Sequence, residues 1–286
     1  MGVAVVGISL SGPLTALVVA PVLAVAFWRN AAGAVVLLPV LLTRERVTLT
    51  GLRWRDLRSS GVAGLFLAAH FAAWLPSLSM TTVAASIALV TTTPIWTALA
   101  ARIAGVQLPA AVWWGLLLAV LGAALIAGVD VTVSLRAVAG DGLALLGAIA
   151  AAGYVLAGAR ARGRLATSAY TVVCYSTCAL VLAVAALGVD VPLGGFSARD
   201  WWLIAAITFV AQLLGHTLLN LVLSSVGPTV VSLAVLLEVP GSLIVALVLL
   251  HQAPPLLALP GMAAVVVGVA LVVRASRPTT LVEAAT

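Results

Sequence analysis

Four ionisable side chains lie inside long apolar stretches of this sequence, and they are the residues best placed to do chemistry. They are His70, His216, Arg29 and Glu238. A charged group at the centre of a membrane helix costs about 2.5–3.5 kcal/mol, so such groups are kept for pairing, proton transfer or ligand binding. We therefore expect Glu238 to face a cavity and to bind or exchange charge there. The alternative is a neutral, hydrogen-bonded glutamic acid that only ties helices together.

The two histidines occupy matching places in the two halves of the chain. His70 and His216 are 146 residues apart. Histidine titrates near neutral pH, so the pair could relay protons. The alternative is two neutral histidines that hydrogen-bond across helices, as polar side chains in membranes commonly do. Two histidines without neighbouring carboxylates, thiols or further histidines fall short of a ligand set, so we expect no metal site.

Arg29 lies slightly outside the centre of its apolar stretch, next to Trp28. Arginine keeps its proton, so its charge must be paired or reach toward the membrane surface. It could hold an anionic group of a ligand, pair with Glu238, or snorkel to the interface. The depth of Arg29 and its aromatic neighbour favour a structural role.

The composition places these residues in a membrane. Of 286 residues, 64% are hydrophobic and 8% are charged. Soluble domains carry about 25% charged residues. This composition excludes a soluble enzyme, a disordered chain and a nucleic-acid binder, despite a net charge of +6. All fourteen basic residues are arginines, and they lie in short clusters between the apolar stretches.

The apolar stretches predict an all-α integral membrane protein with ten transmembrane helices. About 20 apolar residues cross the hydrocarbon core as a helix. The runs are continuous and do not alternate with period two, which argues against a barrel. The ten runs are Val3–Ala20, Val22–Thr43, Ser60–Leu78, Thr82–Ala101, Ala110–Gly128, Gly140–Ala159, Ser168–Leu187, Trp201–Leu223, Thr229–Leu250 and Leu256–Val273.

The arginines predict that both termini are cytoplasmic. With the N-terminus inside, the outside segments hold only Arg136 and Arg199. Positive residues concentrate on the cytoplasmic side of membrane proteins. The inside segments hold the remaining non-membrane arginines, which are Arg44, Arg46, Arg53, Arg55, Arg58, Arg102, Arg160, Arg162, Arg164, Arg274 and Arg277.

The chain repeats itself at an offset of 146 residues. His70 matches His216 and Pro94 matches Pro240, and the register continues without gaps over three predicted helices. Each half then holds five helices, and an odd number forces the second half to insert upside down. The prediction is two inverted five-helix repeats with a binding site near the midplane between them. The predicted boundaries are 1–128, 140–274 and a cytoplasmic tail, 275–286.

The repeat also indicates which residues line the cavity. Pro94 and Pro240 each interrupt a helix and free a carbonyl group, at Val90 and Leu236, and such breaks are tolerated beside cavities. Threonines before Pro94 could satisfy the freed carbonyl. Trp74 and Asn220 follow the two histidines by one helical turn, on the same face. Tyr175 matches Arg29 in the repeat. The predicted binding residues are His70, Trp74, Thr92, Pro94, Tyr175, His216, Asn220 and Glu238.

Small residues form ridges in the fifth and tenth predicted helices. Gly115 and Gly122 match Gly261 and Gly268 at the repeat offset. Such ridges allow close helix packing, within one chain or between two protomers of a homodimer. Two cysteines one helical turn apart, Cys174 and Cys178, fit as packing residues rather than as a disulfide framework.

Five segments carry a resemblance to a known family: FWRN (27–30), HFAAWLPSLS (70–79), TTTPIW (91–96), LLGHTLLN (213–220) and VVSLAVLLE (230–238). Together they resemble the EamA family of the drug/metabolite transporter superfamily. The resemblance implies ten helices in two inverted repeats, cytoplasmic termini, alternating access to a central cavity, and transport of small metabolites. The sequence departs from the family where Gly-Glu is common, since it reads Gly105-Val106 and His251-Gln252, and where Val239 separates Glu238 from Pro240.

These observations favour a secondary transporter, an exporter of an amino acid-like or drug-like metabolite, over two other classes. An enzyme would need paired carboxylates, a nucleophile or a metal cluster. A channel or a structural membrane protein is the alternative. No nucleotide-binding loop is present, so we expect neither ATP drive nor another cofactor. The expected partners are a small-molecule substrate, the lipid bilayer and a second protomer. The arginine- and alanine-rich composition suggests the plasma membrane of a bacterium.

Overall fold

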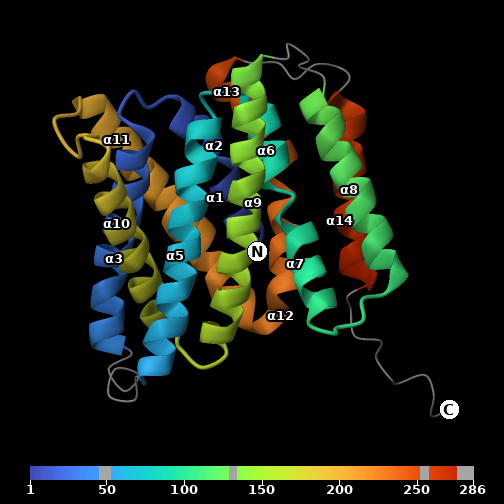
Figure 1. The fold of residues 1–286 in the computed structure, drawn as a ribbon, viewed down its shortest axis with the longest axis horizontal. Helices are drawn as coiled ribbons and strands as arrows, with labels where there is room; N and C mark the ends of the chain where they lie inside the picture. The colour runs from blue at the N-terminus through green and yellow to red at the C-terminus, as the bar shows by residue number, and fades with distance from the viewer. Residues whose placement is uncertain (45–52, 129–133, 252–257, 276–286) are drawn as a thin grey trace.

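The computed structural model describes residues 1–44, 53–128, 134–251 and 258–275, and these residues form helices joined by short connections, with no strand among them (Figure 1). The predicted all-α class is therefore confirmed. Of the predicted tail, only Ala275 lies within the described residues.

In the first half of the chain, two of the predicted apolar runs form two helical pieces each. The first run breaks at Leu10, and the fourth breaks at Thr91 and Thr92. The helices are α1 (Gly2–Ser9), α2 (Ser11–Ala16), α3 (Val22–Arg44), α5 (Trp54–Ser77), α6 (Val83–Val90), α7 (Thr93–Ile103) and α8 (Ala110–Gly128).

The second half contains a ten-residue π-helix and a break that matches the one between α6 and α7. Leu236 and Leu237 separate α12 from α13, and Gly227, at φ 80°, interrupts α12 itself. The helices are α9 (Leu135–Arg162), α10 (Thr167–Gly188), α11 (Ala198–Ile207), the π-helix η1 (Thr208–Thr217), α12 (Leu218–Val235), α13 (Glu238–Leu250) and α14 (Ala258–Ala275).

Several helix ends differ from the apolar runs that predicted them. The helix α5 begins six residues before Ser60, and α9 begins five residues before Gly140. Their first turns contain charged residues, because hydropathy detects only the part of a helix that lies in hydrocarbon. The first run was expected to reach Ala20, but α2 ends at Ala16. A proline disfavours helical backbone at the residue before it, and Pro21 directly follows Ala20.

Six helical stretches of the described chain are long and apolar enough to cross a membrane, judged by length and composition. They are Val22–Thr43, Trp54–Ser77, Ala85–Ile103, Leu135–Arg162, Thr167–Gly188 and Ala198–Val235. Four shorter apolar helices accompany them: Gly2–Ala16, Ala110–Leu125, Glu238–Leu249 and Leu259–Val272.

The packing pairs helices of one half with helices of the other. In Figure 1, α8 and α14 lie side by side at one end of the bundle, α3 and α10 lie at the other end, and α5 and α9 lie between them. The helix α5 of the first half packs against α9, the first helix of the second half. In the same way, η1 of the second half packs against α1, the first helix of the first half.

The two glycine ridges pack against each other within one chain. A Cβ atom on Gly122 would lie 2.6 Å from the carbonyl oxygen of Gly261, and one on Gly115 would lie 2.7 Å from that of Gly268. Gly115, near the start of α8, thus meets Gly268, near the end of α14. Gly122, further along α8, meets Gly261, near the start of α14. These helices, equivalent in the repeat, therefore cross in antiparallel directions with their backbones in close contact.

We predict that Gly122→Val lowers stability, because its side chain would collide with the backbone of α14. Overpacking of this kind costs about 1–3 kcal/mol. The control is Gly142→Val, since a Cβ atom at Gly142, also inside a helix, meets nothing within 4 Å. The measurement is the thermal unfolding midpoint of each purified variant in detergent. Equal midpoints for the two variants would contradict the close contact between α8 and α14.

Candidate functional site

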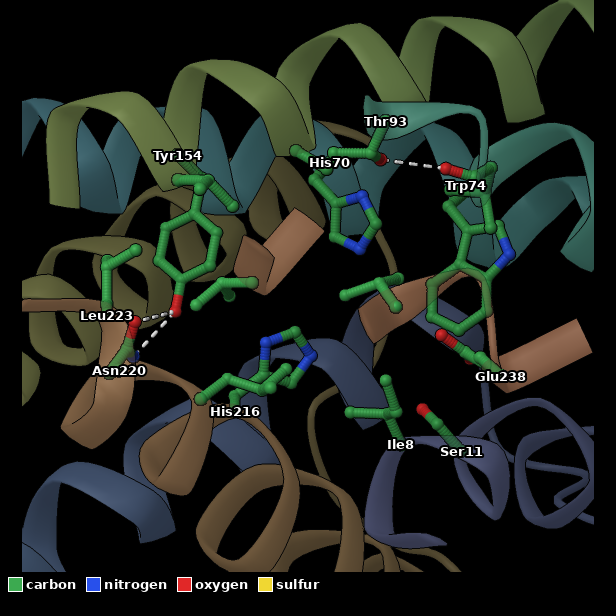
Figure 2. Close-up of a pocket in the computed structure, with 16 residues that line it drawn as sticks. Ile8, Ser11, His70, Trp74, Thr93, Tyr154, His216, Asn220, Leu223 and Glu238 are labelled. Atoms are coloured by element: carbon green, nitrogen blue, oxygen red, sulfur yellow. Dashed lines mark hydrogen bonds between the residues drawn. The ribbon is translucent and has the colours of Figure 1, made fainter. Parts of the chain in front are cut away.

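A cavity lies between helices from both halves of the chain. It is narrow, with about 60 Å³ of room for the centres of water molecules. Figure 2 shows its side chains projecting inward from several helices. The lining residues are Ile8, Ser11, His70, Trp74, Val90, Thr93, Ala151, Tyr154, Val155, His216, Leu219, Asn220, Leu223, Val231, Val235 and Glu238.

His70 is held in place by a bond to the opposite half. Its Nδ1 lies 3.0 Å from the carbonyl oxygen of Gly147 on α9. A carbonyl oxygen only accepts, so Nδ1 carries a hydrogen and donates it. The imidazole also stacks on the indole of Trp74, with ring centroids 5.4 Å apart and planes inclined by 22°. Its position in the cavity is thereby fixed.

His216 enters the cavity from the π-helix η1, opposite His70 (Figure 2). Its ring makes edge contacts with Phe71, at 5.7 Å between centroids, and with Tyr154, at 6.1 Å. A π-helix is wider than an α-helix, and such segments are frequent at functional sites. The structure thus brings the two histidines of the repeat to one cavity, held mainly by aromatic neighbours.

Glu238 is the first residue of α13, directly after the break at Leu236 and Leu237. Its side chain is buried, and it lies on the cavity wall beside Trp74 and Ser11 (Figure 2). Within the described part of the chain, no protein group donates a hydrogen bond to its carboxyl group. The geometry therefore places this carboxyl group toward the cavity rather than in a bond between helices.

Tyr154 and Asn220 form a polar pair at the other side of the cavity. The Tyr154 hydroxyl donates to Oδ1 of Asn220 at 2.9 Å, and Nδ2 of Asn220 lies 2.6 Å from the same hydroxyl oxygen. Asn220 was predicted from the sequence, whereas Tyr154 was missed. Tyr154 matches Ile8 at the repeat offset, and both residues line the cavity. Applying the repeat to every residue of the first helix could have found it.

Arg29 lies just behind the cavity wall and is fully buried. Its Nε donates to Oε1 of Gln212, and its Nη1 donates to the hydroxyl of Ser11, both at 3.0 Å. The guanidinium carbon also lies 4.5 Å from the centre of the Phe71 ring. Ser11 itself lines the cavity, so a single hydroxyl separates this charge from the cavity.

The charge of Arg29 is therefore held by neutral groups. Nε2 of Gln212 donates to Oδ1 of Asn30 at 3.0 Å, which orients the Gln212 amide toward Arg29. No ion pair within 4.0 Å joins Arg29 to Glu238, although both residues are described. The pairing of these two side chains that was considered from the sequence is absent from this geometry.

Three residues predicted for the cavity lie outside its lining. The hydroxyl of Thr92 donates to the carbonyl of Leu89 at 2.7 Å. Pro94 is buried in the first turn of α7. The Tyr175 hydroxyl lies 3.0 Å from that of Thr217.

The helix break before α7 satisfies its own backbone. The hydroxyl of Thr93, which faces the cavity, donates to the carbonyl oxygen of Val90 at 2.9 Å. This is the carbonyl that Pro94 was expected to free, and a nearby threonine was expected to satisfy it. In the matching break, the backbone amide of Val239 donates to the carbonyl of Leu236 at 3.2 Å.

Comparisons with known proteins agree with this architecture. A sequence model described as the EamA-like transporter family matches residues 2–128 and 138–274. No curated protein gives a significant match. Significant structural matches number 27 chains. One of them, a crystal structure titled only as that of a protein, has a TM-score of 0.70 and 19% sequence identity. That match covers 94% of this chain and 96% of the other, and it shows a shared fold.

We predict that Arg29→Ala lowers the folded yield. The change would leave the buried acceptor on Gln212 and the hydroxyl of Ser11 without their donor, at about 1–3 kcal/mol for each orphaned group. Arg29→Lys should restore part of the yield, because lysine keeps the charge but lacks the planar fork that reaches both partners. The control is Arg199→Ala, at an exposed position. The measurement is the monodisperse fraction after purification from membranes. Normal yield for Arg29→Ala, combined with a raised apparent substrate constant, would instead assign Arg29 to substrate binding.

Proposed function

The chain belongs to the EamA-like transporter family, and on that premise we propose that it is a secondary transporter that exports a small metabolite by alternating access. The observation that carries the proposal is the cavity, whose wall is drawn from both halves and includes residues beside two matching helix breaks. In transporters built from inverted repeats, the substrate binds between the halves at such discontinuous helices.

Two features support ten helices in two inverted five-helix repeats. The described chain has helical segments in all ten predicted apolar runs. The equivalent helices α8 and α14 pack in antiparallel directions, as they must when one half is inverted relative to the other. The breaks after Val90 and after Val235 lie within one residue of equivalent positions. They flank the cavity and are natural hinges for its opening to either side.

The chemistry of the wall favours a small amphipathic metabolite, amino acid-like or drug-like. Much of the wall is aliphatic, and the rings of His70, Trp74, Tyr154 and His216 supply flat surfaces. Such surfaces fit an apolar or aromatic body. The Tyr154–Asn220 pair and the carboxyl group of Glu238 supply the few polar groups that orient a ligand in an apolar pocket.

Each polar residue then has a distinct place in the proposed mechanism. Glu238 binds a donor group of the substrate, or a coupling proton, at the start of α13. Asn220 and Tyr154 bind a second polar group on the opposite side. Arg29 keeps Ser11 and Gln212 in place behind the wall. We place the protein in the plasma membrane of a bacterium, with both termini in the cytoplasm.

Flux measurements would separate this transporter from a channel or a structural membrane protein. A comparison of metabolites accumulated by cells with and without the protein would supply candidate substrates. The purified protein in liposomes should then move the radiolabelled candidate at a rate that saturates with concentration. Flux that rises linearly with concentration would indicate a channel, and an absence of flux for every candidate would favour a structural protein.

We predict that Glu238→Gln abolishes transport or removes its pH dependence while the protein stays folded, because the amide keeps the shape of the side chain but carries neither charge nor proton. The matched control is Asp190→Asn, which makes the same chemical change at an exposed position far from the cavity wall. The measurement is flux in liposomes across a range of pH. If Glu238→Gln transports like the control at every pH, the carboxyl group is structural only.

A further inference from the structure

A second site lies away from the cavity, in a cleft between the beginning of α5 and the end of α9. In Figure 1 these two helix ends lie near each other at the lower edge of the bundle. The cleft is lined by Arg55, Arg58, Ser59, Val62, Ala157 and Arg160. Three arginines therefore share one hollow with a hydroxyl group and two apolar side chains.

Among the described residues, no carboxylate lines this cleft beside its three arginines. Within the described residues, the side chains of Arg55, Arg58 and Arg160 form neither an ion pair nor a hydrogen bond. The nearest carboxylate on α5, Asp56, lines a neighbouring hollow with Arg53, Arg55 and Arg164. One of its oxygens accepts from the backbone amide of Arg53 at 3.3 Å. Three like charges converging on one cleft favour an anion between them.

The position of the cleft relates it to the membrane surface. Arg58 lies two residues before the predicted apolar run that begins at Ser60, and Arg160 directly follows the run that ends at Ala159. The guanidinium groups therefore lie at the expected level of the lipid headgroups. The basic end of the cleft faces this level, and its apolar end points into the hydrocarbon.

The apolar end continues along the bundle surface. Val62 is 37% exposed, and Phe66, one helical turn further along α5, is 40% exposed. The Phe66 ring lies directly over Gly153, where a Cβ atom would be 2.5 Å from the ring, so the aromatic side chain lies flat on α9. Together these residues form an apolar track that leads away from the arginines, as an acyl chain does from its headgroup.

We propose that this cleft binds an anionic phospholipid, with its phosphate on Arg55, Arg58 and Arg160 and an acyl chain along Val62 and Phe66. Guanidinium groups bind phosphate oxygens in a bidentate manner, and basic pockets between membrane helices are suited to anionic headgroups. The apolar track favours a lipid over free phosphate. A free anion would use the arginines and leave the track without a role.

The test is native mass spectrometry of the full chain in detergent, titrated with phosphatidylglycerol, with phosphatidylcholine or with sodium phosphate. The wild type should bind phosphatidylglycerol in preference to phosphatidylcholine. The triple variant Arg55→Gln, Arg58→Gln, Arg160→Gln should bind it about a hundredfold more weakly, at about fivefold for each arginine lost. The matched control removes three exposed arginines elsewhere, as Arg102→Gln, Arg199→Gln, Arg274→Gln, and should bind like the wild type.

Three results would overturn the proposal. An equal loss in the two triple variants would indicate general charge attraction rather than this cleft. Equal affinity for the two lipids would remove the role of the arginines. Displacement of phosphatidylglycerol by millimolar sodium phosphate would make this a site for a soluble anion. If the triple variant does not fold, Arg160→Gln alone decides the matter, since a loss of about fivefold supports the site and unchanged binding refutes it.

Discussion

Hydrocarbon offers no hydrogen bonds, so each backbone group in a membrane-spanning segment must find a partner within the protein. The placement of two helix breaks in this chain, after Val90 and after Val235, reflects that constraint. The break after α6 lies against the cavity, where the hydroxyl of Thr93 donates to the carbonyl of Val90. The break before α13 leaves Glu238 on the same cavity wall. Irregular backbone occurs here where protein groups satisfy it, and in doing so it brings polar side chains to the cavity.

The same constraint explains how the chain holds a permanent charge in its interior. Arg29 is fully buried, yet its described partners are an amide, a hydroxyl and an aromatic ring. A carboxylate partner would have cancelled the charge, and Glu238 would then be tied to a helix instead of facing the cavity. Because neutral groups hold Arg29, the carboxyl group of Glu238 stays on the cavity wall. The hydrogen bond from Arg29 to Ser11 connects the charge to the cavity wall, so a movement of Ser11 would change the surroundings of the guanidinium group.

The sequence predicted the features that depend on hydropathy and on repetition. Continuous apolar runs located the helices, and the repeat identified His70 with His216 and Trp74 with Asn220, all four of which line the cavity. The sequence did not predict which of two adjacent residues on a helix faces the cavity. Thr93 rather than Thr92 faces the cavity, because adjacent helical residues differ by about 100° in direction.

Nor could the sequence predict the π-helix, because hydropathy does not distinguish a π-helical segment from an α-helical one. The structural role of Gln212 follows from that segment. Gln212 belongs to η1, and its carbonyl oxygen accepts from the hydroxyl of Thr217, five residues later. Hydropathy gives no reason to connect this glutamine with Arg29, which lies 183 residues earlier in the chain. Contacts between distant segments are fixed only when the helices pack.

The two halves share a backbone plan but differ in chemistry, and this difference bears on how a transporter of this kind would work. His70 matches His216, but Glu238 matches Thr92 and Arg29 matches Tyr175, so the carboxyl and guanidinium groups do not follow the repeat. In an inverted repeat, the inward-open and outward-open states are related by exchanging the conformations of the halves. With identical chemistry the two states would have equal free energy. Here the carboxyl group of Glu238 belongs to the second half alone, so in the proposed transporter its surroundings would differ between the two states, and so would its affinity for a proton or a substrate. A bound ligand shifts a two-state equilibrium only through such a difference in affinity. In the proposed transporter, the backbone symmetry would thus provide the two states, and the placement of Glu238 would provide the means by which a ligand selects between them.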